Sequence, residues 1–142
     1  MIEKAIIKQT HLVKKTVRIE ADQLPALFEY TEYLPFEFGI YKDGPTFFEI
    51  TPSQYQEEKQ TYDVYIPINT EVASTDDFTY VPSLEIKGVR KRVPFEEGLD
   101  EHLNSMKDYM REEGLAIPDK LFLIITPVYG QLFADIIIPE EN

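Results

Sequence analysis

The residues that could carry chemistry in this chain are carboxylates and phenols. Its 142 residues contain no cysteine, two histidines, nine tyrosines and 26 aspartates and glutamates. The absence of cysteine excludes disulfides, thiolate metal ligands and a cysteine nucleophile, and two histidines almost exclude a multi-histidine metal site. We therefore expect neither a metal nor another cofactor, and we favour a protein that is not an enzyme.

Sequence motifs of the common enzyme classes do not occur. The chain has no G-x-G-x-x-G, P-loop, H-E-x-x-H or G-x-S-x-G, so nucleotide-binding, zinc-protease and serine-hydrolase activities receive no support. His11 lies in the region of the first predicted strand and His102 lies beside an apolar helix stripe. A lone histidine of this kind is most often structural.

Three tyrosines are the first candidates for contacts with a ligand. Tyr41, Tyr65 and Tyr129 lie on or beside strands and turns that we expect to border a cleft. A phenol ring can stack on a ligand while its hydroxyl group forms a hydrogen bond. Packing in the core or at its rim is the alternative, and for each tyrosine taken alone it is the favoured interpretation.

The charge of the chain excludes several classes of partner. Its 14 lysines and arginines against 26 acidic residues give a formal net charge of −12. Such a surface disfavours binding to nucleic acid and to anionic membranes, both of which need an excess of cations. The N-terminus lacks a signal-peptide pattern, and no apolar run approaches the ~20 residues of a membrane helix. We expect a soluble, cytoplasmic protein.

Residues 87–92 form the one basic cluster in this acidic sequence. Alternation along a strand would place Arg90 and Arg92 on one face and Lys91 on the other. The favoured interpretation is a solvated edge strand whose cations prevent pairing with another chain. Contact with an anion or an acidic partner is the alternative.

The sequence contains two similar halves, which predicts a single domain, 1–142, with internal repeats at about 1–71 and 72–142. Matching stretches keep their order and nearly keep their spacing, although chance likeness between strands is the alternative. They are TFFEITP (46–52) with LFLIITP (121–127), and YDVYIP (62–67) with ADIIIP (134–139).

Each half is predicted to be a strand, a helix and two further strands. Asp22 is expected to cap the first helix and Pro35 to end it, with Gly39 as a left-handed turn residue. Together the two β-α-β-β units predict an α+β fold with one antiparallel, barrel-like sheet, two helices and a groove between the halves. The predicted strands are 13–19, 47–51, 62–68, 84–93, 121–126 and 134–138, and the helices 22–34 and 99–110.

This tandem pattern resembles the GyrI-like (gyrase-inhibitor-like) effector-binding domain, a bacterial family with an SHS2-type duplication. The same domain is attached to AraC-type and MerR-type transcription activators. The resemblance implies the effector-binding-domain fold and a cavity lined by aromatic residues between the repeats. It rests on GIYKDGPTFF (39–48), YDVYIPI (62–68), residues 88–115, LFLIITP (121–127) and DIIIP (135–139).

The resemblance also implies where a ligand binds. Relatives that bind organic cations use a glutamate in the strand before the last hairpin, but residues 121–125 contain no carboxylate, which argues against cationic ligands. Glu49 is the carboxylate of the matching strand in the first half, and a solvent-facing position is its alternative. The predicted ligand-binding set is Glu49, Tyr41, Tyr65, Phe47 and Tyr129.

Three functions follow, in order of preference. The first is a stand-alone module that binds a small organic ligand in the groove and has no DNA-binding domain of its own. The alternative is a protein-interaction or inhibitor module, in the manner of the gyrase-inhibitory relatives, that acts on a basic partner surface, because complementary charge speeds and orients association. An accessory protein of a secretion or toxin locus is one form that this alternative takes. The third is a hydrolase that uses Glu49 with Tyr65.

Overall fold

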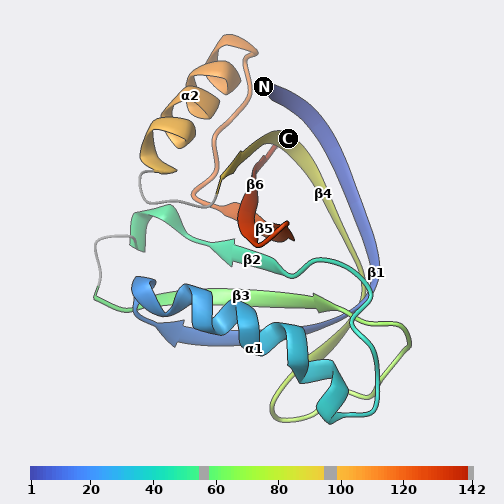
Figure 1. Cartoon of the computed structure of the whole chain (residues 1–142). Helices are drawn as coiled ribbons and strands as arrows, with labels where there is room; N and C mark the ends of the chain where they lie inside the picture. The colour runs from blue at the N-terminus through green and yellow to red at the C-terminus, as the bar shows by residue number, and fades with distance from the viewer. Residues whose placement is uncertain (55–57, 95–98, 141–142) are drawn as a thin grey trace.

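The computed structural model describes residues 1–54, 58–94 and 99–140, and within them it contains six strands and two α-helices (Figure 1). No helix in this part of the chain is long and apolar enough to cross a membrane. The elements are β1 (Ile2–Ile19), η1 (Ala21–Gln23), α1 (Leu24–Glu37), β2 (Phe47–Ile50), η2 (Pro52–Gln54), β3 (Gln60–Pro67), β4 (Thr79–Pro94), α2 (Leu99–Glu112), β5 (Leu121–Val128) and β6 (Gln131–Pro139).

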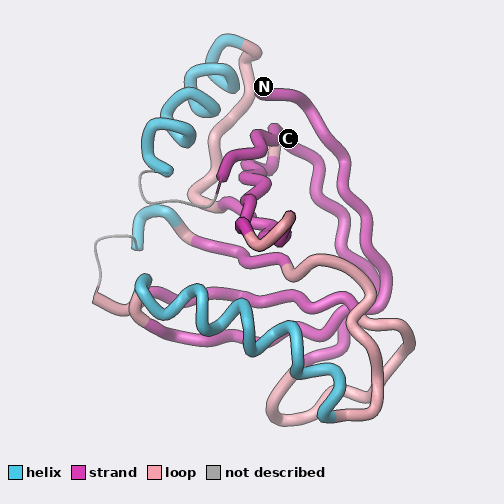
Figure 2. The backbone as a smooth tube through the Cα atoms, viewed as in Figure 1, coloured by secondary structure: helices cyan, strands magenta, loops and turns pink. Residues whose placement is uncertain are grey.

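All strand pairs are antiparallel, and the strands close into a barrel in the order β1-β3-β2-β5-β6-β4. This confirms the predicted α+β fold with one barrel-like sheet and two helices. The long strands β1 and β4 curve side by side, and α1 lies in front of β3 (Figures 1 and 2). Strands of the first half meet those of the second at β1–β4 and at β2–β5.

Two apolar clusters lie on opposite faces of the sheet. Cross-strand partners share a face, so Phe48, Val64 and Leu123 point together toward one side. There they join the apolar stripes of both helices, represented by Phe28 of α1 and Met106 of α2, in the larger cluster. A strand buried on both faces appears as a continuous apolar run, which explains the composition of β5 from Leu121 to Ile125.

The smaller cluster occupies the other face. Phe47 and Tyr65 are cross-strand partners there, and Phe122 and Ile137 are another pair. These side chains do not meet the helices, and they form the floor on which a ligand site can be built. A residue's face therefore follows from its register in the barrel.

Helix α1 differs from the prediction at both ends. Pro35 does not end the helix, which continues to Glu37. A proline removes its own N–H and crowds the turn before it, but its carbonyl remains available, and here it accepts bonds from the N–H groups of Phe38 and Ile40. Asp22 is not the cap either, because it lies in η1 and Gln23 holds the N-cap position without a side-chain bond. Gly39 has the predicted left-handed backbone, with φ of 72°.

The basic segment 87–92 is not an edge strand, so that prediction was wrong. It belongs to β4, which pairs with β1 on one side and β6 on the other because the sheet is closed. Both of its arginines are neutralised locally. Arg90 pairs with Glu3, and the guanidinium of Arg92 donates two bonds, of 2.7 and 3.0 Å, to the carboxylate of Asp135.

Gly88 is predicted to be the least replaceable of the glycines in the part of the chain that the structure describes. A Cβ there would lie 2.2 Å from the carbonyl oxygen of Ile138, whereas Gly114 has open space around it and requires only its positive φ. We expect Gly88→Ala to lower the free energy of unfolding by about 3 kcal/mol and Gly114→Ala by about 1 kcal/mol. Urea denaturation of both variants measures this, and equal losses would contradict the close approach of β4 and β6.

Candidate functional site

A hollow of about 400 Å³ lies on the face of the smaller cluster. Both halves of the chain contribute to it, since β2 and β3 supply two residues and the segments around β4, β5 and β6 supply the rest. It is lined by Glu49, Tyr65, Leu84, Glu85, Ile86, Lys87, Lys120, Phe122, Pro139 and Glu140.

Strand register brings the central residues of this hollow together. Glu49 of β2 lies opposite Phe122 of β5, so the two side chains share a face. On the other side of β2, Glu49 lies opposite Asp63, and Tyr65 is two residues further along β3 on the same face. The rings of Tyr65 and Phe122 are 6.4 Å apart between centroids and tilted by 50°. We call the two rings of Tyr65 and Phe122, with the carboxylate of Glu49 between them, the aromatic corner.

Glu49 holds two polar partners in this corner. The hydroxyl group of Tyr65 donates to Glu49 Oε1 at 3.4 Å, and the ammonium group of Lys120 lies 3.3 Å from the same oxygen. The side chain of Glu49 is 20% exposed and that of Lys120 is 47% exposed. Lys120 Nζ also lies 5.4 Å from the centroid of the Phe122 ring, within the range of a cation–π contact.

The other carboxylates at the hollow are paired with lysines as well. Glu85 lies 3.9 Å from Lys8, and Glu140 lies 3.9 Å from Lys87. The hollow therefore combines apolar walls with polar groups that already have partners. Such a site can hold a small organic molecule by apolar contact while one or two polar groups orient it.

The structure brings some of the predicted residues together and separates others. Glu49 and Tyr65 line the hollow, and Phe47 is buried beside them in the smaller cluster as the cross-strand partner of Tyr65. Tyr41 is exposed and packs edge-on against Phe36, at 5.7 Å between ring centroids. Tyr129 is fully exposed in the turn between β5 and β6. Neither of these two tyrosines lines the hollow.

Residues that were not predicted from the sequence complete the site. Phe122 corresponds to Phe47 when the sequences of the two halves are aligned, so its aromatic character is a signal that sequence analysis could use. Lys120 carried none, because a lysine before a strand is typical of a solvated surface. Leu84 and Ile86 fall in a predicted strand, but which part of the barrel they face depends on the closure between β1 and β4.

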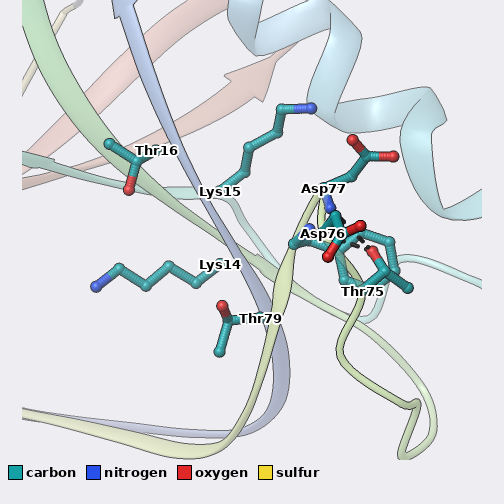
Figure 3. Close-up of a pocket in the computed structure, with 8 residues that line it drawn as sticks. Lys14, Lys15, Thr16, Thr75, Asp76, Asp77 and Thr79 are labelled. Atoms are coloured by element: carbon teal, nitrogen blue, oxygen red, sulfur yellow. Dashed lines mark hydrogen bonds between the residues drawn. The ribbon is translucent and has the colours of Figure 1, made fainter.

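A second hollow, of about 390 Å³, lies between β1 and the turn before β4 (Figure 3). Lys14 and Lys15 border it and point to different sides of the strand. Thr75 Oγ1 accepts bonds from the N–H groups of Asp77 and Phe78, which orders the turn. Its lining is largely polar, so it offers an organic ligand little apolar contact. In the part of the chain that the structure describes, no three histidine, aspartate or glutamate side chains are arranged to hold a metal.

Comparison with solved structures places this fold among known domains. The C-terminal domain of EcmrR matches with a TM-score of 0.72 at 11% identity, over 100% of this chain and 99% of that one. The chain shares its fold. EcmrR in a complex with DNA matches with a TM-score of 0.73 at 11% identity, over 99% of this chain and 58% of that one.

SAV2435, solved with tetraphenylphosphonium bound, is a third structure with this fold. It matches with a TM-score of 0.58 at 11% identity, over 99% of this chain and 94% of that one. No family model matches the sequence, and no curated protein does. At this level of identity the likeness concerns the fold, and the effector-binding-domain fold expected from the sequence is thereby confirmed.

The environment of Tyr65 predicts a pH dependence. Burial raises the pKa of its phenol above the ordinary value of 10.0, and the charges of Glu49 and Asp63 raise that pKa further. The stabilising contribution of Tyr65 is therefore complete below about pH 10, where the phenol of the unfolded chain ionises, and is lost as the pH rises above it. We expect the free energy of unfolding to fall less steeply above about pH 10 in Tyr65→Phe than in the wild type.

Urea denaturation across this alkaline range measures the slope. Glu49→Gln serves as the second variant, because it removes the first of the two charges while keeping the phenol. It should shift ionisation of Tyr65, followed by phenolate absorbance, to lower pH. Identical pH profiles for the wild type and Tyr65→Phe would contradict the environment assigned to this phenol.

Proposed function

We propose that this protein is a small-molecule-binding module related to the GyrI-like effector-binding domains, and that its ligand occupies the hollow between the two halves. The observation that carries the proposal is the aromatic corner at Glu49, in which residues of both halves converge. Tetraphenylphosphonium bound to SAV2435, which has this fold, supports it. Fold alone does not specify function, so the argument rests on the site.

The size and lining of the hollow suit an organic ligand. Its volume of about 400 Å³ falls within the ~300–1,000 Å³ that is usual for small-molecule sites. Leu84, Ile86 and Phe122 offer apolar contact, and burial of apolar surface supplies most of the binding free energy in such sites. Glu49 and Lys120 stand at one side, where they can orient a polar group of the ligand.

Filling the hollow should abolish binding. Leu84 is half-buried on β4 and lines the hollow, so Leu84→Trp places a larger side chain in it. We expect a panel of cationic, anionic and neutral aromatic compounds to contain ligands that raise the wild-type melting temperature by about 10 °C when the free ligand concentration is a hundred times Kd. Leu84→Trp should lose these shifts.

The matched control is Gln131→Trp, at the exposed start of β6 and outside the lining of the hollow. It adds the same side chain to the surface and should keep every shift. Thermal-shift fluorimetry measures all three proteins. Equal shifts in the wild type and Leu84→Trp would place the ligand elsewhere and contradict the proposed site.

A second candidate function, docking of a protein partner, is favoured by one surface of α1. Five aromatic side chains of α1 and the following turn are between 42% and 67% exposed. Glu29, Glu37 and Asp43 are exposed beside them. Large exposed apolar surfaces mark interaction sites, and the acidic border favours a basic partner over a second copy of this chain. We call these five residues the α1 aromatic surface: Tyr30, Tyr33, Phe36, Phe38 and Tyr41.

Substitutions on the α1 aromatic surface test this candidate. We expect wild-type protein to capture a basic partner at a stoichiometric ratio from a lysate of the source cells, and the double variant Tyr33→Ser, Phe36→Ser to lose it. Tyr129→Ser removes a still more exposed tyrosine on the β5–β6 turn and should retain the partner. Affinity capture with quantitative mass spectrometry measures the ratios. Recovery of chaperones alone would count against docking.

A further inference from the structure

We propose that the ammonium group of Lys120 occupies the place beside Glu49 and Phe122 that a ligand cation would otherwise take. The site therefore selects uncharged organic ligands over organic cations. The inference rests on the proposed function and adds to it the chemical class of the ligand. It follows from the positions of two lysines relative to the aromatic corner and its carboxylates.

The aromatic corner has the composition of a receptor for a cation. A carboxylate beside an aromatic face attracts a positive group through its charge and through the ring quadrupole. Lys120 Nζ already lies 3.3 Å from Glu49 Oε1 and 5.4 Å from the centroid of the Phe122 ring. The position that a ligand cation would take therefore holds an ammonium group of the chain itself.

A second lysine covers the other ring of the corner. Lys14 Nζ lies 5.5 Å from the centroid of the Tyr65 ring and 3.9 Å from a carboxylate oxygen of Asp63. The hydroxyl group of Tyr65 is directed to Glu49. A ligand cation would have to displace Lys120 or Lys14 to reach these carboxylates, whose charges the two lysines already neutralise.

The remaining charges around the hollow lead to the same conclusion. Each carboxylate at or beside it has a lysine within 4 Å, so no unopposed negative charge draws a cation in. An uncharged ligand does not compete with any of these pairs, and the apolar walls remain available to it. The four pairs are Glu49–Lys120, Glu85–Lys8, Glu140–Lys87 and Asp63–Lys14.

Removal of Lys120 should shift the ligand preference of the hollow toward organic cations without destabilising the fold. Its side chain is 47% exposed, and ion pairs of this exposure contribute little to folding stability. In Lys120→Met, Glu49 and the face of Phe122 become free to receive a ligand cation. We expect the affinity for an aromatic monocation to rise about tenfold, which corresponds to ~1.4 kcal/mol.

Two probes of similar shape and different charge separate the classes. Methyltriphenylphosphonium carries one positive charge, and triphenylphosphine oxide, which has an oxygen in place of the methyl group, carries none. We expect the wild type to bind the oxide more tightly than the phosphonium in calorimetric titrations. Lys120→Met should bind the phosphonium about tenfold more tightly than the wild type and the oxide with nearly unchanged affinity.

Two further variants separate a local effect of Lys120 from an effect of the net charge. Lys107→Met, on α2 and outside the lining of the hollow, removes the same charge from the protein and should leave both affinities unchanged. Adding Glu49→Gln to Lys120→Met removes the carboxylate and should cancel the gain. A gain in Lys107→Met equal to that in Lys120→Met would overturn the inference, because the effect would then belong to the net charge.

Failure of the inference is distinguishable from failure of the proposed function. Binding of the oxide by the wild type, with no gain for the phosphonium in Lys120→Met, overturns the role of Lys120 and leaves the ligand site in place. Preference of the wild type for the phosphonium also overturns that role. If neither the wild type nor Lys120→Met binds either probe, the proposed function and the inference are both overturned.

Discussion

Closure of the antiparallel sheet is the constraint on which the rest of the molecule depends. Each of the six strands is paired on both sides for at least part of its length, and the two halves are joined by β1–β4 and by β2–β5. With closure, strand alternation assigns every side chain to one of two faces. One face receives the helices, and the other keeps the smaller apolar cluster and the hollow above it. The position of Glu49 between Tyr65 and Phe122 is a direct result of that register.

Periodicity and turn residues predict where most helices and strands lie in the sequence. They do not predict which strands pair with each other or how far a strand is extended by its pairing. The stripe Leu99–Met110 and the apolar run Leu121–Thr126 lie in α2 and β5. The length of β1 was missed because Ile2–Thr10 mixes charged and apolar residues without strict alternation, and it becomes a strand by pairing with β4. Segment 87–92 was assigned to an edge for the same reason, since pairing on both sides is a property of the closed sheet.

The candidate site was predictable in its aromatic and carboxylate members and not in its cations. Glu49 and Tyr65 stand in strands with a recognisable pattern, so their types and spacing carry information. Lys120 acquires its role from residues distant in sequence, Glu49 and Phe122, whose placement beside it depends on the β2–β5 pairing. His11 is similar, because its Nδ1 lies 2.6 Å from the hydroxyl group of Tyr80, a partner that no local pattern indicates. The net charge of −12 likewise says nothing about the hollow, where carboxylates and lysines balance.

The two junctions between the halves also govern the order in which the chain can fold. Ile2 pairs with Lys91 and Phe47 with Ile124, so both junctions join residues that are far apart in the sequence. Proteins dominated by such pairings fold slowly, because the entropy of closing long loops is lost before the contacts form. During synthesis the apolar residues of β2 and β3 emerge well before β5, and until then one side of β2 has no strand to pair with. An unpaired apolar strand is prone to aggregate, so β2 carries this hazard throughout the interval between its own synthesis and that of β5.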